Sequence, residues 1–205
     1  MGRPRIVVLI SGTGSNLQAV VDACAAGHIG ADVVGVVSND SDAYGLVRAD
    51  AAGIDTRLVV AHADESRQAY DTRLADAVAS FDPDWVLLAG WMRLLTMAFL
   101  DRFTGVVVNL HPALPGELPG TRSIERAWAE ALAGDRSSSG VMVHLVPDEG
   151  VDDGPTLGSR VVPVDTSGTL EQFATDVHDA EHALLVEVLA SLCAPTTTDQ
   201  EGPPT

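Results

Sequence analysis

The feature that most constrains the fold is a repeated alternation between short, unbroken apolar runs and longer segments with helical spacing. The runs RIVVLI (5–10), DVVGVVS (32–38), DWVLLAG (84–90) and GVVVN (105–109) are rich in Val, Leu and Ile. Strands buried on both faces have this composition, whereas half-exposed strands alternate apolar and polar residues. The order therefore predicts an α/β domain with an open, mostly parallel twisted sheet and helices on both faces.

Segments with helical spacing separate these runs. Helices are expected at about 16–27, 44–53, 64–81, 97–103 and 169–192, the first two ending at a glycine. The run DTRLVV (55–60) predicts one more strand. After residue 135 the pattern changes, and two strands, SSSGVMVHLV (137–146) and GSRVVPV (158–164), are expected to flank the loop PDEGVDDGPTL. The C-terminal part of the chain is therefore expected to add antiparallel strands to the sheet.

Length and composition suit one domain. The chain has 205 residues, of which 46% are hydrophobic, and neither a linker nor an internal repeat divides it. We expect a single domain over residues 1–194. Residues 195–205 are polar and rich in Pro and Thr, so we expect a disordered tail.

The charge and the two cysteines limit the partners. The formal net charge is −17, which disfavours binding to nucleic acid or to an anionic membrane. No apolar run approaches the ~20 residues that span a bilayer, and the first run is interpreted as a strand rather than a secretory signal. Cys24 and Cys193 lack metal-ligand spacing, so we expect no metal, and a cytoplasmic location.

The loop SGTGSN (11–16) follows the first strand and opens a helix. It lacks the Lys of a P-loop, and a dinucleotide fingerprint would need glycine in place of Leu17. One interpretation is a glycine-rich turn without a ligand. The other is a monophosphate site at a helix N-terminus, where free N–H groups and the helix dipole favour an anion.

Asn109 and His111 interrupt the apolar pattern at the end of a predicted strand. Residues two apart on a strand point to the same side, and Pro112 favours an extended backbone at His111. The simple explanation is a strand end that reaches water. The functional one is an amide that donates to a developing oxyanion beside an imidazole that moves a proton. Because no Ser or Cys nucleophile is near, direct transfer between two bound substrates fits better than a covalent intermediate.

A histidine that stays protonated needs a carboxylate nearby, because an opposite charge raises its pKa. The loop between the last two predicted strands supplies Asp148, Glu149, Asp152 and Asp153, although it is equally consistent with a solvated turn. Among the other histidines, His28 and His62 are expected at the surface, and His144 is expected as a satisfied core residue rather than a catalyst.

Taken together, the motifs resemble a known family. IVVLISGTGSNLQAVVDA, SNDSDAYGLVRADAAGI, SRQAYD, LLAGWMRLL, NLHPALPG, VHLVPDEGVDDGP and AEHALLVEVL follow one another as in the phosphoribosylglycinamide formyltransferases, over roughly residues 5–192. The resemblance implies a Rossmann-like formyltransferase fold. It also implies the transfer of the formyl group of 10-formyltetrahydrofolate, as co-substrate, to the amine of glycinamide ribonucleotide in purine biosynthesis. It further implies that the partners are small molecules and that the protein is a monomer or a homodimer.

The resemblance also implies roles for particular residues. Asn109 would hold the formyl oxygen, His111 would protonate the tetrahedral intermediate, and Asp152 would raise the pKa of His111. The ribonucleotide would be bound by Gly14, Ser15, Asn16 and Glu181. The folate would be bound by Arg67, Met92, Arg93, Leu94, Leu95, Asn109, Asp148 and Asp152, with the 147–152 loop closing over the pterin.

Some positions depart from the family pattern. Many relatives have two leucines before a proline where this chain has Pro115-Gly116, and often a hydroxyl residue where it has Met142. The acidic loop has one extra residue, so Asp152 is favoured over Asp153 only by its distance from Gly154-Pro155. A formyltetrahydrofolate deformylase is one alternative, although it would carry an N-terminal regulatory domain. A methionyl-tRNA formyltransferase would need a C-terminal domain and a surface tolerant of RNA. A non-catalytic folate or nucleotide sensor would be expected to lose Asn109, His111 or Asp152.

Overall fold

The computed structural model describes residues 2–195. Its seven strands form one sheet in the order β3-β2-β1-β4-β5-β6-β7. The strands are β1 (Arg5–Ile10), β2 (Asp32–Ser38), β3 (Thr56–Leu58), β4 (Trp85–Leu88), β5 (Val107–His111), β6 (Ser138–Leu145) and β7 (Thr156–Pro163). Strands β1 to β5 pair in parallel, whereas β6 pairs antiparallel with β5 and with β7. The predicted mostly parallel α/β sheet with an antiparallel addition is confirmed.

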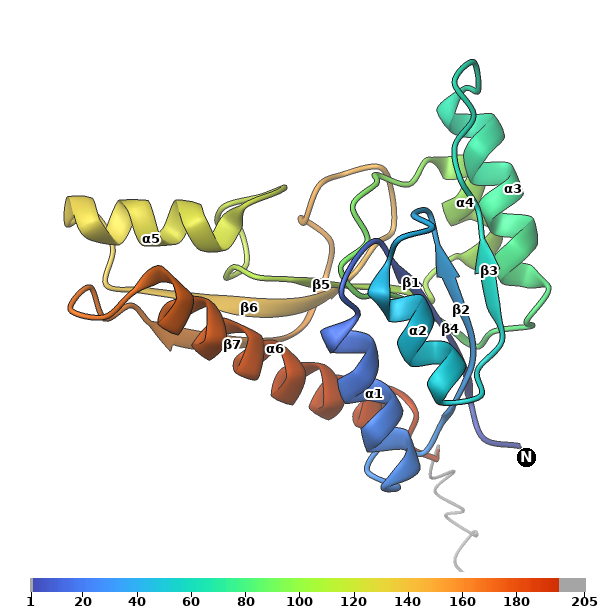
Figure 1. Cartoon of the computed structure of the whole chain (residues 1–205), viewed down its shortest axis with the longest axis horizontal. Coiled ribbons are helices and arrows are strands. Elements are labelled where there is room, and N and C mark those ends of the chain that lie inside the picture. Colours follow the sequence, from blue (N-terminus) through green and yellow to red (C-terminus); the bar gives the residue numbers. More distant parts are fainter. Residues whose placement is uncertain (1, 196–205) are drawn as a thin grey trace, which may run out of the picture.

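Helices cover both faces of this sheet (Figure 1). They are α1 (Ser15–Ala25), α2 (Tyr44–Ala51), α3 (Arg67–Ala79), α4 (Met97–Leu100) with the 3-10 turn η1 (Asp101–Phe103), α5 (Ser123–Ala133) and α6 (Leu170–Leu192). The central strand β1 explains why the predicted strands are apolar throughout. Its Ile6, Val8 and Ile10 pack in the core with α1 and α6, while Val7 and Leu9 pack in a second core with α3 and α4.

Several predicted boundaries shift for local reasons. Strand β3 covers only three residues of the expected 55–60 run, because as an edge strand it pairs only with β2. Helix α3 begins at Arg67 rather than near residue 64, since the Ser66 hydroxyl caps it by accepting the Ala69 N–H at 3.2 Å. Strand β7 begins two residues earlier than expected, at Thr156.

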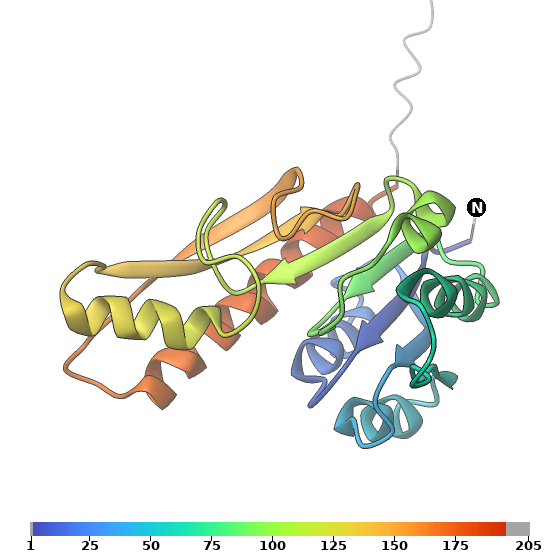
Figure 2. The ribbon, with the colours of Figure 1, turned by 90° about the horizontal axis from the view of Figure 1, so that it is seen from above.

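Helix α5 was missing from the sequence prediction. Its N-cap is Arg122, in a left-handed conformation and without a side-chain cap, so the usual Ser, Thr or Asp signal for a helix start is absent. The helix buries Ala127 and Ala131, and Trp128 stacks on Phe173 of α6 at 5.9 Å. Figure 2 shows α5 and α6 beside the antiparallel strands β6 and β7.

Strands β1, β4 and β5 end at the same edge of the sheet, where the loops that follow β1 and β4 are hydrogen-bonded to each other. Ser11 donates its N–H to the Gly90 carbonyl at 3.2 Å, and the Ser11 hydroxyl accepts the Met92 N–H at 2.9 Å. This is where ligands bind in open α/β sheets. The division into one domain and a tail remains a prediction, and residues 196–205 of that tail lie outside the described residues. No helix among residues 2–195 is long and apolar enough to cross a membrane.

Candidate active site

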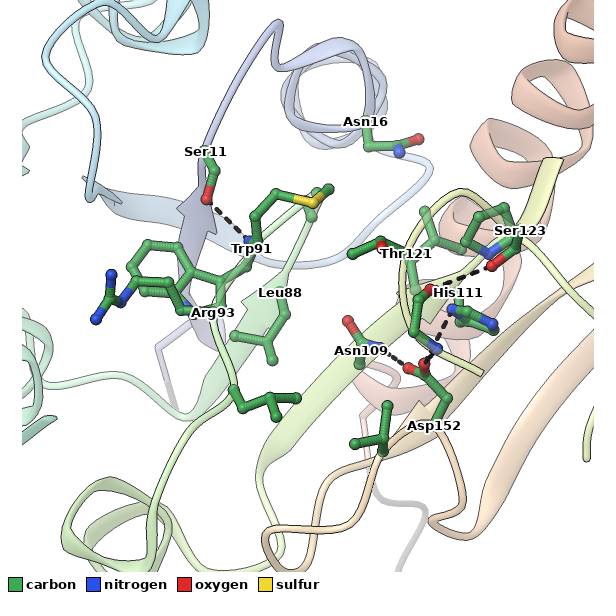
Figure 3. A pocket seen from close by; sticks show the side chains of 18 of the residues that line it. Ser11, Asn16, Leu88, Trp91, Arg93, Asn109, His111, Thr121, Ser123 and Asp152 are labelled. Atoms are coloured by element: carbon green, nitrogen blue, oxygen red, sulfur yellow. Dashed lines mark hydrogen bonds and ion pairs between the residues drawn. The ribbon is translucent and has the colours of Figure 1, made fainter. Parts of the chain in front are cut away.

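A cavity of about 850 Å³ opens at this edge (Figure 3). Its size is that of a site for a cofactor-sized ligand. Most of the residues expected to bind or react line it, and they are Gly14, Ser15, Asn16, Met92, Arg93, Leu94, Leu95, Asn109, His111, Asp148, Asp152 and Glu181. Arg67 does not line the cavity; it is exposed and donates to the carbonyl of Leu94, which does line it, at 3.2 Å.

Asn109, His111 and Asp152 form one hydrogen-bonded cluster (Figure 3). Val108 and Leu110 of β5 point into the core beside α6, so Asn109 and His111 share the other side of the strand. Asp152 comes from the β6–β7 loop. Its Oδ1 accepts the Asn109 Nδ2–H at 3.0 Å, and its Oδ2 lies 3.3 Å from His111 Nδ1. Asp153 does not line the cavity.

His144 belongs to the same cluster and holds Asn109. Its Nδ1 donates to the Leu145 carbonyl at 2.8 Å, which leaves the Nε2 lone pair to accept the Asn109 Nδ2–H at 3.1 Å. The sequence correctly indicated a satisfied core histidine, but missed that it orients the neighbouring amide. Both Nδ2 hydrogens of Asn109 are used in this state, so holding a formyl oxygen requires one of them to exchange its partner.

The two nitrogens of His111 both face acceptors. The Leu118 carbonyl can only accept, so His111 Nε2, 3.1 Å away, carries a hydrogen. In the neutral ring, Nδ1 then presents a lone pair to Asp152 Oδ2, and only a second proton makes that contact favourable. The gap between Nδ1 and Oδ2 is therefore where this site can take up a proton.

The electrostatic balance differs from the expected one. Burial lowers the pKa of His111 below its ordinary value, and the charge of Asp152 opposes this only in part. Burial opposes ionisation of Asp152 too, but the pKa of Asp152 still lies below its usual range, because the Gly120 N–H donates to Oδ2 at 2.8 Å. The carboxylate stands where a protonated histidine needs it, yet desolvation favours the neutral ring at rest.

A strained loop, residues 116–122, braces the cluster and was missed from the sequence. Gly116 and Gly120 adopt positive φ without strain, whereas Leu118 and Arg122 have φ of 45° and 60°, which is strained for residues with a Cβ. The loop supplies the Leu118 carbonyl to His111 and the Gly120 N–H to Asp152 Oδ2 at 2.8 Å. Backbone strain of this kind persists where function needs a fixed geometry. Its signals in the sequence are the two Pro-Gly pairs of PGELPG (115–120), the first of which departs from the family pattern.

Free N–H groups line the end of the cavity formed by loop 11–16. Gly14 is the N-cap of α1, in a left-handed conformation, and no side chain caps the helix. The first N–H groups of α1, at the positive end of the helix dipole, therefore remain free to donate. Asn16 is only 9% exposed, and its Oδ1 has no partner among residues 2–195. Glu181 of α6 lies at the cavity too, and its Oε2 is 2.7 Å from His178 Nδ1, a histidine that was not singled out.

The other end of the cavity is apolar. Met92 and Leu94 are more than half exposed, whereas Leu95 is buried. The Arg93 guanidinium lies 4.4 Å from the centre of the Tyr70 ring. Glu149 accepts the Met97 N–H at 2.9 Å, which holds the acidic loop against α4. Met142, in place of a hydroxyl residue, is buried and pairs with His111 across β5 and β6.

Residues 2–195 contain no group of three or more His, Cys, Asp or Glu side chains that could hold a metal ion. What the site offers is an amide, an imidazole and a carboxylate in contact, between a loop with free N–H groups and an apolar slot. This arrangement is that of an enzyme that transfers a small group between an anionic and a largely apolar substrate.

A family model described as formyl transferase matches residues 4–189, and the chain therefore belongs to the formyl transferase family. The phosphoribosylglycinamide formyltransferase of Escherichia coli is 41% identical over 90% of this chain and 85% of its own length. That of Saccharomyces cerevisiae is 40% identical over 89% and 94%. The resemblance stated from the sequence is thus confirmed, and the chain falls among the phosphoribosylglycinamide formyltransferases of this family.

Solved structures agree with this placement. A glycinamide ribonucleotide transformylase from Symbiobacterium toebii superposes with a TM-score of 0.86 and 37% identity, covering 93% of this chain and 88% of the other. A phosphoribosylglycinamide formyltransferase from Brucella melitensis has a TM-score of 0.84 and 37% identity, with 94% and 97% covered. The formyltransferase fold is therefore confirmed.

Proposed function

We propose that this protein transfers the formyl group of 10-formyltetrahydrofolate to the primary amine of glycinamide ribonucleotide, in the de novo synthesis of purines. The observation that carries the proposal is the contact of Asn109, His111 and Asp152 at the cavity, in a chain similar to the phosphoribosylglycinamide formyltransferases. Formyltetrahydrofolate is a co-substrate, and the reaction as proposed uses no metal. We further propose that the enzyme works in the cytoplasm, as a monomer or a homodimer, with small molecules as its partners.

The two ends of the cavity differ in chemistry, and each suits one of the two substrates. The ribonucleotide phosphate binds the N–H groups of loop 11–16, and its ribose hydroxyls donate to the Glu181 carboxylate. The pterin binds in the apolar slot of residues 91–95, where backbone groups satisfy its polar edge. Asp148 and the rest of the 147–152 loop cover it, while Arg93 and Arg67 meet the carboxylates of the folate tail.

The chemistry follows from the cluster. The amine attacks the formyl carbon, and the carbonyl oxygen becomes an oxyanion in a tetrahedral intermediate. Asn109 Nδ2–H and His111 Nε2–H donate to this oxygen, which replaces the Leu118 carbonyl on His111. His111, as the imidazolium that Asp152 stabilises, gives its Nε2 proton to N10 of the folate as the C–N10 bond breaks, and Nε2 then takes up the proton that the amine loses.

The test is a steady-state assay with both substrates. We expect formylated ribonucleotide to appear in step with the loss of formylfolate, and little loss of formylfolate without the ribonucleotide. Hydrolysis of formylfolate at the same rate without ribonucleotide would instead identify a deformylase.

A variant assay tests the cluster itself. His111→Ala should lower kcat by at least about 10²–10⁴-fold, the usual contribution of a positioned proton-transfer group. His62→Ala, at an exposed histidine away from the cavity, is the matched control and should keep full activity. Near-normal turnover in His111→Ala would refute the assigned role.

A further inference from the structure

We propose that Arg48 of α2 is a positioning residue of the ribonucleotide site, whose guanidinium holds loop 11–16 in the conformation that accepts the phosphate. This inference rests on the proposed function for the identity of the ligand. Arg48 does not line the cavity, and nothing in the sequence pattern singled it out.

The Arg48 side chain is fixed by three contacts. Its Nε donates to the Thr13 carbonyl at 3.0 Å, and its Nη1 donates to Gln18 Oε1 at 3.3 Å. The guanidinium also lies 5.1 Å from the centre of the Tyr44 ring. The first contact joins α2 to loop 11–16, and the second joins α2 to the first turns of α1.

The backbone of α2 packs against the same loop. Gly45 N–H donates to the Gly12 carbonyl at 3.0 Å. A Cβ added to Gly14 would lie 2.6 Å from Gly45 Cα and 3.5 Å from Arg48 Cδ. The start of α2 and the loop are therefore in direct contact, and Arg48 lies directly behind Gly14.

These bonds determine where the loop N–H groups point. In a trans peptide the carbonyl and the following N–H point in opposite directions. Because α2 draws the Gly12 and Thr13 carbonyls toward itself, the N–H groups of Thr13 and Gly14 point away from α2. Thr13 and Gly14 line the cavity, and within residues 2–195 neither N–H donates a hydrogen bond. Arg48, through the Thr13 carbonyl, thus turns the Gly14 N–H toward the phosphate position, and Gly45, through the Gly12 carbonyl, turns the Thr13 N–H the same way.

The charge of Arg48 matters for the same reason. The chain has a net charge of −17, and the Glu181 carboxylate lies buried at the same cavity. A phosphate dianion entering this field needs a local cation, and a guanidinium held behind the loop supplies one without filling the cavity.

The experiment compares Arg48→Gln with Arg57→Gln. Arg57 is also a surface arginine stacked on an aromatic ring, with its guanidinium 5.0 Å from the Phe81 centroid, but it is remote from the cavity. We expect Arg48→Gln to raise the KM for glycinamide ribonucleotide about tenfold, with kcat and the KM for formylfolate changed by less than about twofold. Arg57→Gln should leave all three unchanged.

Ribose 5-phosphate binding, measured by calorimetry, separates this inference from the proposed function. The Kd for ribose 5-phosphate should rise about tenfold in Arg48→Gln, whether or not the wild-type protein has transferase activity. A lack of transferase activity in the wild type would count against the proposed function alone. Should the Gln variant fail to fold, Arg48→Lys should fold and show an intermediate Kd, because it keeps the charge but loses the planar fork. Equal increases in both substrate KM values, or an unchanged Kd for ribose 5-phosphate in a folded variant, would overturn the inference.

Discussion

Replacing Asp152 by Asn tests how the catalytic cluster is held. Asp152 Oδ1 accepts from Asn109 at 3.0 Å, and Oδ2 accepts from the Gly120 N–H at 2.8 Å and faces His111 at 3.3 Å. Asn at position 152 has one carbonyl oxygen and one NH₂ group, so in either orientation at least one of these contacts becomes donor against donor. The negative charge that favours the imidazolium is lost as well.

The expected size of the effect follows from those contacts. One hydrogen bond to the carboxylate fails and the charged contact with His111 is lost, and interactions of this kind contribute about 1.5–3 kcal/mol each, so the barrier should rise by about 3–6 kcal/mol. That corresponds to a loss of about 10²–10⁴-fold in kcat/KM. The assay is the initial rate of ribonucleotide formylation at saturating and limiting substrate.

The matched control is Asp153→Asn. The Asp153 carboxylate lies outside the cavity, against Gly150, so this variant should keep its rate within about threefold of the wild type, a shift of well under 1 kcal/mol. A greater loss in Asp153→Asn than in Asp152→Asn, or less than a tenfold loss in Asp152→Asn, would refute this account of the cluster.

Three further changes test other parts of the molecule. Gly14→Ala should lower the melting temperature and raise the ribonucleotide KM, because φ is 71° there and a Cβ meets α2; unchanged kinetics would contradict it. Tyr70→Phe should lower the free energy of unfolding in urea by about 1–2 kcal/mol with an unchanged m-value, because the Tyr70 hydroxyl donates to the buried Val59 carbonyl at 2.8 Å. A free energy of unfolding equal to that of the wild type would refute this. The hydrogen bond to Glu181 raises the pKa of His178, so the protonated His178 stabilises the fold fully below about pH 6.5, and this stabilisation is lost as pH rises through the raised pKa. The stability of the wild type relative to His178→Gln should therefore fall as pH rises through that pKa, and a stability difference that grows with pH would disprove this.

The sheet could be predicted from the sequence because its signal is local. Strands 5–10 and 32–38 match β1 and β2 residue for residue, since continuous Val and Ile runs indicate strands buried on both faces. The pairing of Asn109 with His111 followed from the same geometry. Helix α5 also has a local signal, since the buried Ala127 and Ala131 recur at helical spacing, but the left-handed turn at Arg122, without a capping side chain, hides where the helix starts.

The electrostatics of the site depended on contacts distant in the sequence. A carboxylate near His111 was predicted, but the net direction of the His111 pKa depends on how deeply the fold buries the ring. Likewise, the contact of His144 with Asn109 depends on the register of β5 against β6, where these two residues face each other. Sequence spacing carries neither the burial nor the register.

The most direct test of the central claim is a crystal structure with glycinamide ribonucleotide and a non-hydrolysable formylfolate analogue bound together. The account predicts the analogue's formyl oxygen within about 3.2 Å of Asn109 Nδ2 and of a His111 ring nitrogen, with the phosphate on the N–H groups of residues 13–16. A formyl oxygen held elsewhere in the cavity, with the Leu118 carbonyl still bonded to His111, would contradict it.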